Sequence, residues 1–203
     1  MINFKKNKYK IGLGLFFLYL ILKNKQPMTD FFNNLVKFIL KMEGGLSNDP
    51  TDNASSYPAP VWQKYHTNKG VTYRTFVDNA TKLNYLPTID NFLKMPNEIW
   101  LKIYKDIYLS KAVSKNLTDN EILNAYISLW YWGGWSTSII SLDSVKSVLN
   151  ENISNKAKLK KLVDLRILYF NKLVLAKPTY KIYLKGWTNR ANEFYQQFNN
   201  YLN

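Results

Sequence analysis

Apolar residues recur at spacings of three and four along most of the chain, which is the period of an amphipathic helix. The first such run follows a candidate cap at Thr29 or Asp30 and ends at Gly44 and Gly45, which break helices. The same spacing predicts later helices over residues 73–84, 96–110, 118–132, 154–174 and 179–202. Candidate strands are few and lie near residues 53–66 and over Gly70 to Tyr73. The pattern therefore predicts a mainly α-helical fold with a small hairpin-bearing lobe.

The N-terminal segment differs from the rest because residues 11–22 form an uninterrupted apolar run flanked by lysines. Twelve residues span only about 18 Å as a helix, less than the roughly 30 Å hydrocarbon core of a bilayer. The run fits a signal-peptide core, yet no small-residue cleavage site follows it. We therefore expect residues 1–27 to be an uncleaved signal anchor whose lysines extend its reach into the headgroups. The alternative is a buried or interfacial helix of a soluble protein.

Lysines are more numerous before the apolar run than directly after it, which favours an N-terminus in the cytoplasm. The remaining residues, 28–203, keep a net charge of +8 out of a total of +14. A basic surface suits an anionic cell wall, anionic lipid or nucleic acid. The lysines are dispersed and no nucleic-acid-binding motif is present, so no nucleic-acid partner is expected. The chain has no cysteine and a single histidine, so neither a metal site nor a cofactor is predicted.

Glu43 is the strongest candidate for chemistry. It closes the first helix, where the negative end of the helix dipole and the apolar face both raise a carboxyl pKa. A general acid that works near neutral pH needs such a raised pKa. A second carboxylate, Asp52, follows after eight intervening residues, and a carboxyl pair of this kind suits glycoside hydrolysis. The alternative is a surface glutamate in front of a Gly-Gly helix stop.

Three separated blocks of the chain, residues 40–45, 48–52 and 67–76, resemble glycoside hydrolase family 108, the phage and bacterial N-acetylmuramidases. The resemblance implies a lysozyme-like α+β fold and cleavage of the bond between N-acetylmuramic acid and N-acetylglucosamine in peptidoglycan. A fourth block, with Arg166, Tyr169, Phe170, Pro178 and residues 184–192, resembles the predicted peptidoglycan domain that usually follows this catalytic segment.

The apolar run and this resemblance together divide the chain into an anchor over residues 1–27, a lysozyme-like catalytic segment over 28–117 and a helical peptidoglycan-domain-like segment over 118–203. No Ser-, Gly- or Pro-rich linker separates the last two segments, so we expect them to pack into one domain. The alternative is a distinct wall-binding unit at the C-terminus.

The resemblance also implies a catalytic set of Glu43 as general acid, Asp52 as second carboxylate and Thr67 as a hydroxyl that positions water or a carboxylate. Asp49 competes with Asp52, although an Asp-Pro step in a turn has a sufficient structural explanation. Thr72 is the alternative to Thr67, because this chain carries a longer segment after the aspartate than family members usually have.

Residues expected beside the substrate are Asp49, Trp62, His66, Thr72 and Tyr73. The segment over 53–66 is interpreted either as a surface loop or, through Trp62 and its tyrosines, as a platform that stacks on sugar rings. His66, beside an aromatic residue, is typical of a packed histidine. The tryptophans of residues 130–135 are interpreted as core, with sugar stacking as the alternative. Leu129 stands where the related domain often has an aspartate.

Two functions therefore remain open. The favoured one is an endolysin-like, peptidoglycan-degrading muramidase tethered to a membrane through residues 11–22. Such an enzyme would face the periplasm from the inner membrane, or lie in the virion or host membrane if it is phage-encoded. The alternative is a non-catalytic, membrane-anchored protein that binds peptidoglycan.

Overall fold

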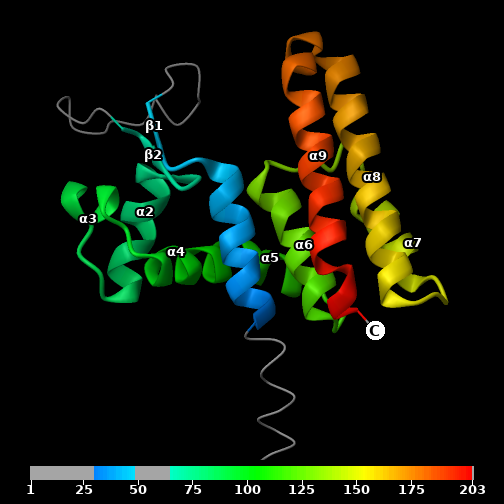
Figure 1. Ribbon diagram of the computed structural model, residues 1–203, viewed down its shortest axis with the longest axis horizontal. Helices are drawn as coiled ribbons and strands as arrows, with labels where there is room; N and C mark the ends of the chain where they lie inside the picture. The colour runs from blue at the N-terminus through cyan, green and yellow to red at the C-terminus, as the bar shows by residue number, and fades with distance from the viewer. Residues whose placement is uncertain (1–29, 49–64, 203) are drawn as a thin grey trace, which may run out of the picture. The chain divides into compact units, whose positions relative to one another are not determined.

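The computed structural model describes residues 30–48 and 65–202 (Figure 1). The chain divides into two compact units, Met1–Lys37 and Phe38–Asn203. Residues 30–43 are helical, which confirms the helix predicted in front of Gly44. The anchor expected over residues 1–27, with its apolar run at 11–22, lies outside the described residues. Across the part of the chain that the structure describes, none of the helices combines the length and the apolar character needed to cross a membrane.

The second unit carries a small antiparallel sheet of three strands in the order β1 (Leu46–Ser47), β2 (Thr67–Asn68) and β3 (Val71–Thr72). A two-residue turn, Lys69 and Gly70, joins β2 to β3, and both residues have positive φ values, 53° and 75°. A tight two-residue hairpin turn whose twist matches that of the flanking strands requires positive φ at both of its residues. The strand predicted over Gly70 to Tyr73 is therefore present as β3, which is one residue shorter at each end because Gly70 belongs to the turn and Tyr73 begins a helix.

Short helices follow the sheet. They are α2 (Tyr73–Ala80), the 3₁₀ turn η2 (Thr81–Leu83), α3 (Ile89–Leu93), α4 (Asn97–Tyr104), the π-helical segment η3 (Lys105–Leu109) and α5 (Ser110–Val113). The helix predicted over 73–84 corresponds to α2 and η2, and that over 96–110 to α4, η3 and the start of α5. Helix α3 was not predicted, because five residues are too few to show a helical period.

The longer helices form the rest of the unit. They are α6 (Glu121–Trp132), α7 (Leu142–Asn150), α8 (Asn155–Ala176), the 3₁₀ turn η4 (Pro178–Tyr180), α9 (Lys181–Phe198) and the 3₁₀ turn η5 (Asn199–Tyr201). Asn120 caps α6 by accepting hydrogen bonds from the backbone N–H groups of Ile122 and Leu123. The predicted helices over 118–132, 154–174 and 179–202 are confirmed, whereas α7 was not predicted.

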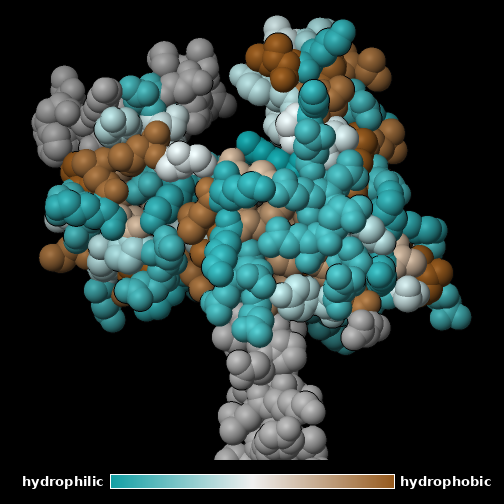
Figure 2. All heavy atoms as spheres, in the orientation of Figure 1, coloured by the Kyte–Doolittle hydropathy of each residue, from teal (hydrophilic) through white to brown (hydrophobic). Residues whose placement is uncertain are grey.

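Helix α6 is buried around most of its circumference, so it lies in the core rather than over it. Helices α8 and α9 pack side by side as an antiparallel pair, and α6 contacts α8 (Figure 1). Figure 2 shows apolar side chains at the free end of the α8–α9 pair, where Leu175 and Ile182 are exposed. A mainly helical chain with one small antiparallel sheet fits the lysozyme-like α+β class predicted from the sequence.

Candidate active site

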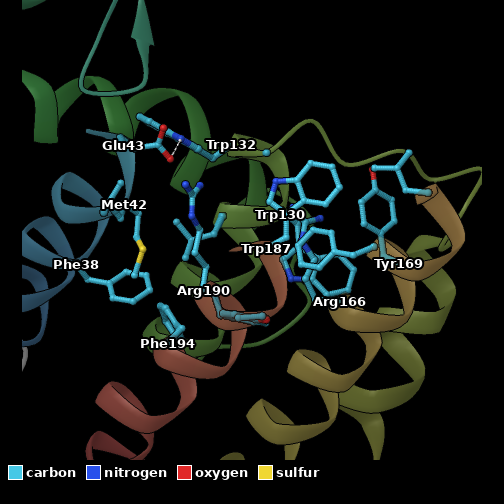
Figure 3. Close-up of a pocket in the computed structure, with 17 residues that line it drawn as sticks. Phe38, Met42, Glu43, Trp130, Trp132, Arg166, Tyr169, Trp187, Arg190 and Phe194 are labelled. Carbon is cyan, nitrogen blue, oxygen red and sulfur yellow. Dashed lines mark hydrogen bonds between the residues drawn. The ribbon is translucent and has the colours of Figure 1, made fainter. Parts of the chain in front are cut away.

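Glu43 is the last residue of the helix over residues 30–43. Gly44 and Gly45 follow it with φ values of 68° and 93°, the left-handed backbone that ends a helix. The Glu43 side chain is half-buried, and its Oε1 accepts a hydrogen bond of 3.1 Å from the indole Nε1 of Trp132 (Figure 3). Trp132 is the last residue of α6. The fold thus holds a carboxyl group at the C-terminal end of one helix with an indole from another.

The hairpin turn packs against the other oxygen of Glu43. A Cβ atom built on Gly70 would lie 2.7 Å from Glu43 Oε2 and 2.5 Å from Trp132 Cζ2. At these distances any side chain would displace the Glu43 carboxyl group or the Trp132 indole, and the positive φ of this position also favours glycine. Glu43 therefore lies between an indole and the backbone of the turn.

The turn itself is fixed by hydrogen bonds to α4 and the residues before it. The Trp100 indole donates to the Lys69 carbonyl over 2.9 Å. The Lys69 ammonium donates to the Met95 carbonyl over 2.7 Å and to Asn97 Oδ1 over 2.8 Å. In β2, the Asn68 amide donates to the Phe92 carbonyl over 2.6 Å. These contacts keep the backbone at Gly70 in place beside the carboxyl group.

Aromatic rings surround Trp132 on the side of α4 and η3. Its ring centroid lies 4.6 Å from Tyr108, 5.7 Å from Trp100 and 5.9 Å from Tyr104. Tyr108 belongs to the π-helical segment η3, and π-helical turns shift side chains around a helix and occur often at functional sites. The rings fix the indole that binds Glu43.

Burial raises the pKa of Glu43 above its ordinary value of 4.5. The positive charge of Arg190 and the hydrogen bond from Trp132 lower this pKa, and both effects are smaller than that of burial. Burial and the negative charge of Glu43 together raise the pKa of Tyr108. A carboxyl group that keeps its proton at higher pH than usual, next to open space, is suited to donate that proton to a substrate.

A cavity of about 180 Å³ adjoins Glu43. Its walls come from the helix that ends at Glu43, from α6 and from α8 and α9 (Figure 3). Most of the lining is aromatic or aliphatic, and the charged residues among it are Glu43, Arg166 and Arg190. Figure 3 shows Arg190 extending toward Glu43. The last third of the chain thus contributes one wall of the same cavity as the candidate acid.

The other predicted site residues divide into two groups. His66 and Thr67 are buried together, with His66 Nδ1 3.1 Å from Thr67 Oγ1. Thr72 caps α2 by accepting from the Thr75 N–H over 3.1 Å, and Tyr73 packs edge-on against Phe92 at 5.2 Å. These residues lie in or beside the sheet whose turn contacts Glu43. Asp49, Asp52 and Trp62 lie outside the described residues.

Three residues of this site were not predicted as site residues from the sequence: Trp132, Arg166 and Arg190. Trp130 is 1% exposed, which confirms the interpretation of that tryptophan as core. Trp132 differs, because it faces the candidate acid. Residues two apart in a helix point about 200° apart, so Trp130 and Trp132 project differently from α6 and only Trp132 meets Glu43, although both line the cavity. The two-residue offset between these tryptophans was the signal in the sequence that they have different surroundings.

No group of three or more metal-ligating side chains gathers within residues 30–48 and 65–202. Residues 36–134 match the family model described as Glycosyl hydrolase 108. This segment is a glycosyl hydrolase 108 domain, and the protein is accordingly a glycoside hydrolase. The match contains Glu43, Gly70 and Trp132 and ends before α7. No curated protein and no solved structure matches the chain.

Proposed function

We propose that the protein is a muramidase that hydrolyses the glycosidic bond between N-acetylmuramic acid and N-acetylglucosamine in peptidoglycan, with Glu43 as general acid. The observation that supports this most is the environment of Glu43. Burial raises its pKa, Trp132 donates a hydrogen bond to one of its oxygens, the Gly70 turn packs against the other, and a cavity opens beside it. The family match covers the residue and its two neighbours in space.

In the proposed reaction, Glu43 donates its proton to the glycosidic oxygen as the bond from that oxygen to the anomeric carbon breaks. An ionised Asp52 supports the opposite face of the sugar, and Asp49 is the alternative for this role. Water adds to the anomeric carbon, and its proton restores the acid. Thr67 is proposed to position the water or the second carboxylate through its hydroxyl, which both donates and accepts.

A chemical analysis of digested walls tests this reaction. Purified peptidoglycan is incubated with the full chain, reduced with borohydride and hydrolysed to its sugars. A muramidase leaves muramic acid at each new reducing end, so reduced muramic acid should accumulate with time. Reduced glucosamine in its place would refute the proposed bond. Retention of the protein on walls without any new reducing end would support the alternative, a non-catalytic binding protein.

We further propose that residues 1–27 tether the enzyme to a membrane, either the inner membrane of its host or, for a phage-encoded enzyme, the virion or host membrane. The support is the apolar run over residues 11–22 between lysines. The full chain should sediment with membranes and remain there in high salt, because salt screens lysine–lipid attraction but leaves apolar insertion intact. Release by salt alone would refute the tether and leave the proposed reaction untouched.

A further inference from the structure

Arginine is rare in this chain and gathers at the cavity beside Glu43. Of 28 basic residues, three are arginines: Arg74, Arg166 and Arg190. Two of these three, Arg166 from α8 and Arg190 from α9, line the cavity. Arginine differs from lysine in presenting a planar fork of donors that matches a carboxylate or phosphate in two hydrogen bonds. The cavity therefore has the side chains that recognise an oxyanion.

Arg166 is 6% exposed, and its Nη1 has no hydrogen-bond partner among the described residues. Its guanidinium carbon lies 4.8 to 5.0 Å from the ring centroids of Phe170, Tyr169 and Trp130. A Cβ atom on Gly133 would lie 2.7 Å from Arg166 Nη2, so this glycine leaves room for the guanidinium. Aromatic faces attract the cation without satisfying its N–H donors. The Arg166 side chain is thus fixed in place, and the N–H groups of its Nη1 can still donate hydrogen bonds to a ligand.

The charges of the cavity are also unbalanced. Within the described residues, no acidic side chain forms an ion pair with Arg166 or Arg190. Burial lowers the pKa of Arg166 to about 10, which still leaves it positively charged at neutral pH. When Glu43 carries the proton that a general acid needs, the cavity lining holds two cations and no anion. Arg166 is buried, whereas Arg190 is exposed and its charge acts on Glu43. An unpaired buried charge is costly, so the environment of Arg166 favours an incoming anion.

Two neutral donors add to the polar groups of the cavity wall. Trp130 Nε1 and the Tyr126 hydroxyl are buried in the cavity wall, and they lie near each other without a hydrogen bond of normal geometry. Water could satisfy these neutral groups, but it could not balance a guanidinium charge. An oxyanion supplies both acceptor atoms and the opposite charge. A carboxylate fits a cavity of about 180 Å³ that is mostly apolar apart from these groups.

We propose that this cavity binds a carboxylate carried by the muramic acid residue of the substrate, and that Arg166 and Arg190 are the residues that bind it. The proposal rests on the proposed muramidase function and extends it to substrate selection. In peptidoglycan, the carboxylate belongs to the lactyl group where the sugar carries no peptide. Where a peptide is joined to the lactyl group as an amide, the carboxylate belongs to the peptide. Its capture would place the neighbouring glycosidic oxygen near Glu43, since both arginines line the same cavity as the acid.

The test compares walls that differ only in charge. Purified peptidoglycan is used intact or after its carboxylates have been converted to amides by carbodiimide coupling with ammonia. The wild-type full chain should cleave intact walls at least about tenfold faster, in kcat/KM, than amidated walls, as expected for the loss of a hydrogen-bonded charged group. Arg190→Gln and Arg166→Gln should lose this preference. Arg74→Gln is the matched control, because Arg74 pairs with Asp78 on the exposed face of α2, and it should keep the wild-type ratio.

The ratio isolates binding of the carboxylate from effects on the acid, because Glu43 acts on both substrates alike. Gly133→Ala supplies a second variant in case Arg166→Gln fails to fold. It keeps the arginine but pushes its guanidinium aside, and should also reduce the ratio. Glycan strands stripped of peptide by an amidase, with and without amidation, identify the source of the group. The amidase frees a lactyl carboxylate that is an amide in the intact wall, so a preference on stripped strands shows that the cavity accepts the lactyl group. A preference confined to intact walls assigns the carboxylate to the peptide.

Equal cleavage of intact and amidated walls by the wild-type chain would overturn the proposal while leaving the muramidase function standing. A ratio reduced as strongly in Arg74→Gln as in Arg190→Gln would overturn it as well, since any loss of positive charge would then suffice. Absence of reduced muramic acid from every substrate would refute the muramidase function instead. In that case, the amounts of protein retained on intact and on amidated walls would decide the binding proposal. The wild-type chain should bind intact walls better, and Arg190→Gln should remove the difference.

Discussion

Replacing Gly70 with alanine would put a methyl group between the two residues that face it, Glu43 and Trp132. The new Cβ would start 2.7 Å from Glu43 Oε2 and 2.5 Å from Trp132 Cζ2. Ordinary contact begins at 3.4 Å, so the carboxylate must move by about 0.7 Å and the indole by about 0.9 Å. The indole has little room, because Tyr108 and Trp100 pack against it. Misplacement of a catalytic group by about 1 Å can cost roughly 100-fold in rate, and we expect a loss of that order.

The measurement is the rate of reducing-end release from purified walls, together with the free energy of unfolding from chemical denaturation. Gly134→Ala is the matched control, because Gly134 has a similar φ of 69° but nothing within 4 Å of its would-be Cβ. Both variants should lose roughly 1–2 kcal/mol of stability from the left-handed backbone, whereas only Gly70→Ala should lose most of its activity. Activity of Gly70→Ala within twofold of that of Gly134→Ala would show that the turn does not position the acid.

Three further changes test the groups around Glu43. Trp132→Phe removes a hydrogen bond that lowers the pKa of Glu43, so the alkaline limb of the pH–rate profile should move to higher pH. The control is Trp135→Phe, which removes an indole that donates to the Ile140 carbonyl, and it should leave the limb unchanged. Burial raises the pKa of Glu43 above 4.5, so its ionisation costs stability as pH rises from about 4.5 through the raised value. Glu43→Gln should therefore raise the melting temperature at pH 7 but not at pH 3, and an equal gain at both would contradict the raised pKa. Trp100→Phe removes the hydrogen bond to the Lys69 carbonyl and should lower the free energy of unfolding, measured by chemical denaturation, by at least about 1 kcal/mol. An unchanged free energy of unfolding would show that this hydrogen bond does not hold the turn.

Local patterns were sufficient to predict the elements that carry the proposed acid. The helix ending at Glu43, its glycine stop and the hairpin near Gly70 follow from residues close together in sequence. The helices α3 and α7 were missed for local reasons. Helix α3 is too short to show a helical period, and α7 follows a run rich in serine and threonine, residues 136–141, that is typical of a loop.

The partners of Glu43 could not be found in that way, because they come from distant parts of the chain. Trp132 lies 89 residues away in sequence, and Arg190 lies on the last long helix. Only the packing of α6 and α9 beside residues 38–43 brings these groups to one cavity. The predicted rise in the pKa of Glu43 was right in direction, and burial proves to be its largest cause.

The most direct measurement of the role of Glu43 is the rate at which Glu43→Gln releases reducing ends from purified peptidoglycan. Glutamine keeps the size of the side chain and an oxygen that can accept from Trp132, but it has no proton to donate. The rate should fall by at least about two orders of magnitude, the usual contribution of a positioned acid, while folding and wall binding persist. Glu193→Gln, which removes a surface carboxylate paired with Lys41, should retain the wild-type rate. Near-normal release of reducing ends by Glu43→Gln would remove Glu43 from the mechanism.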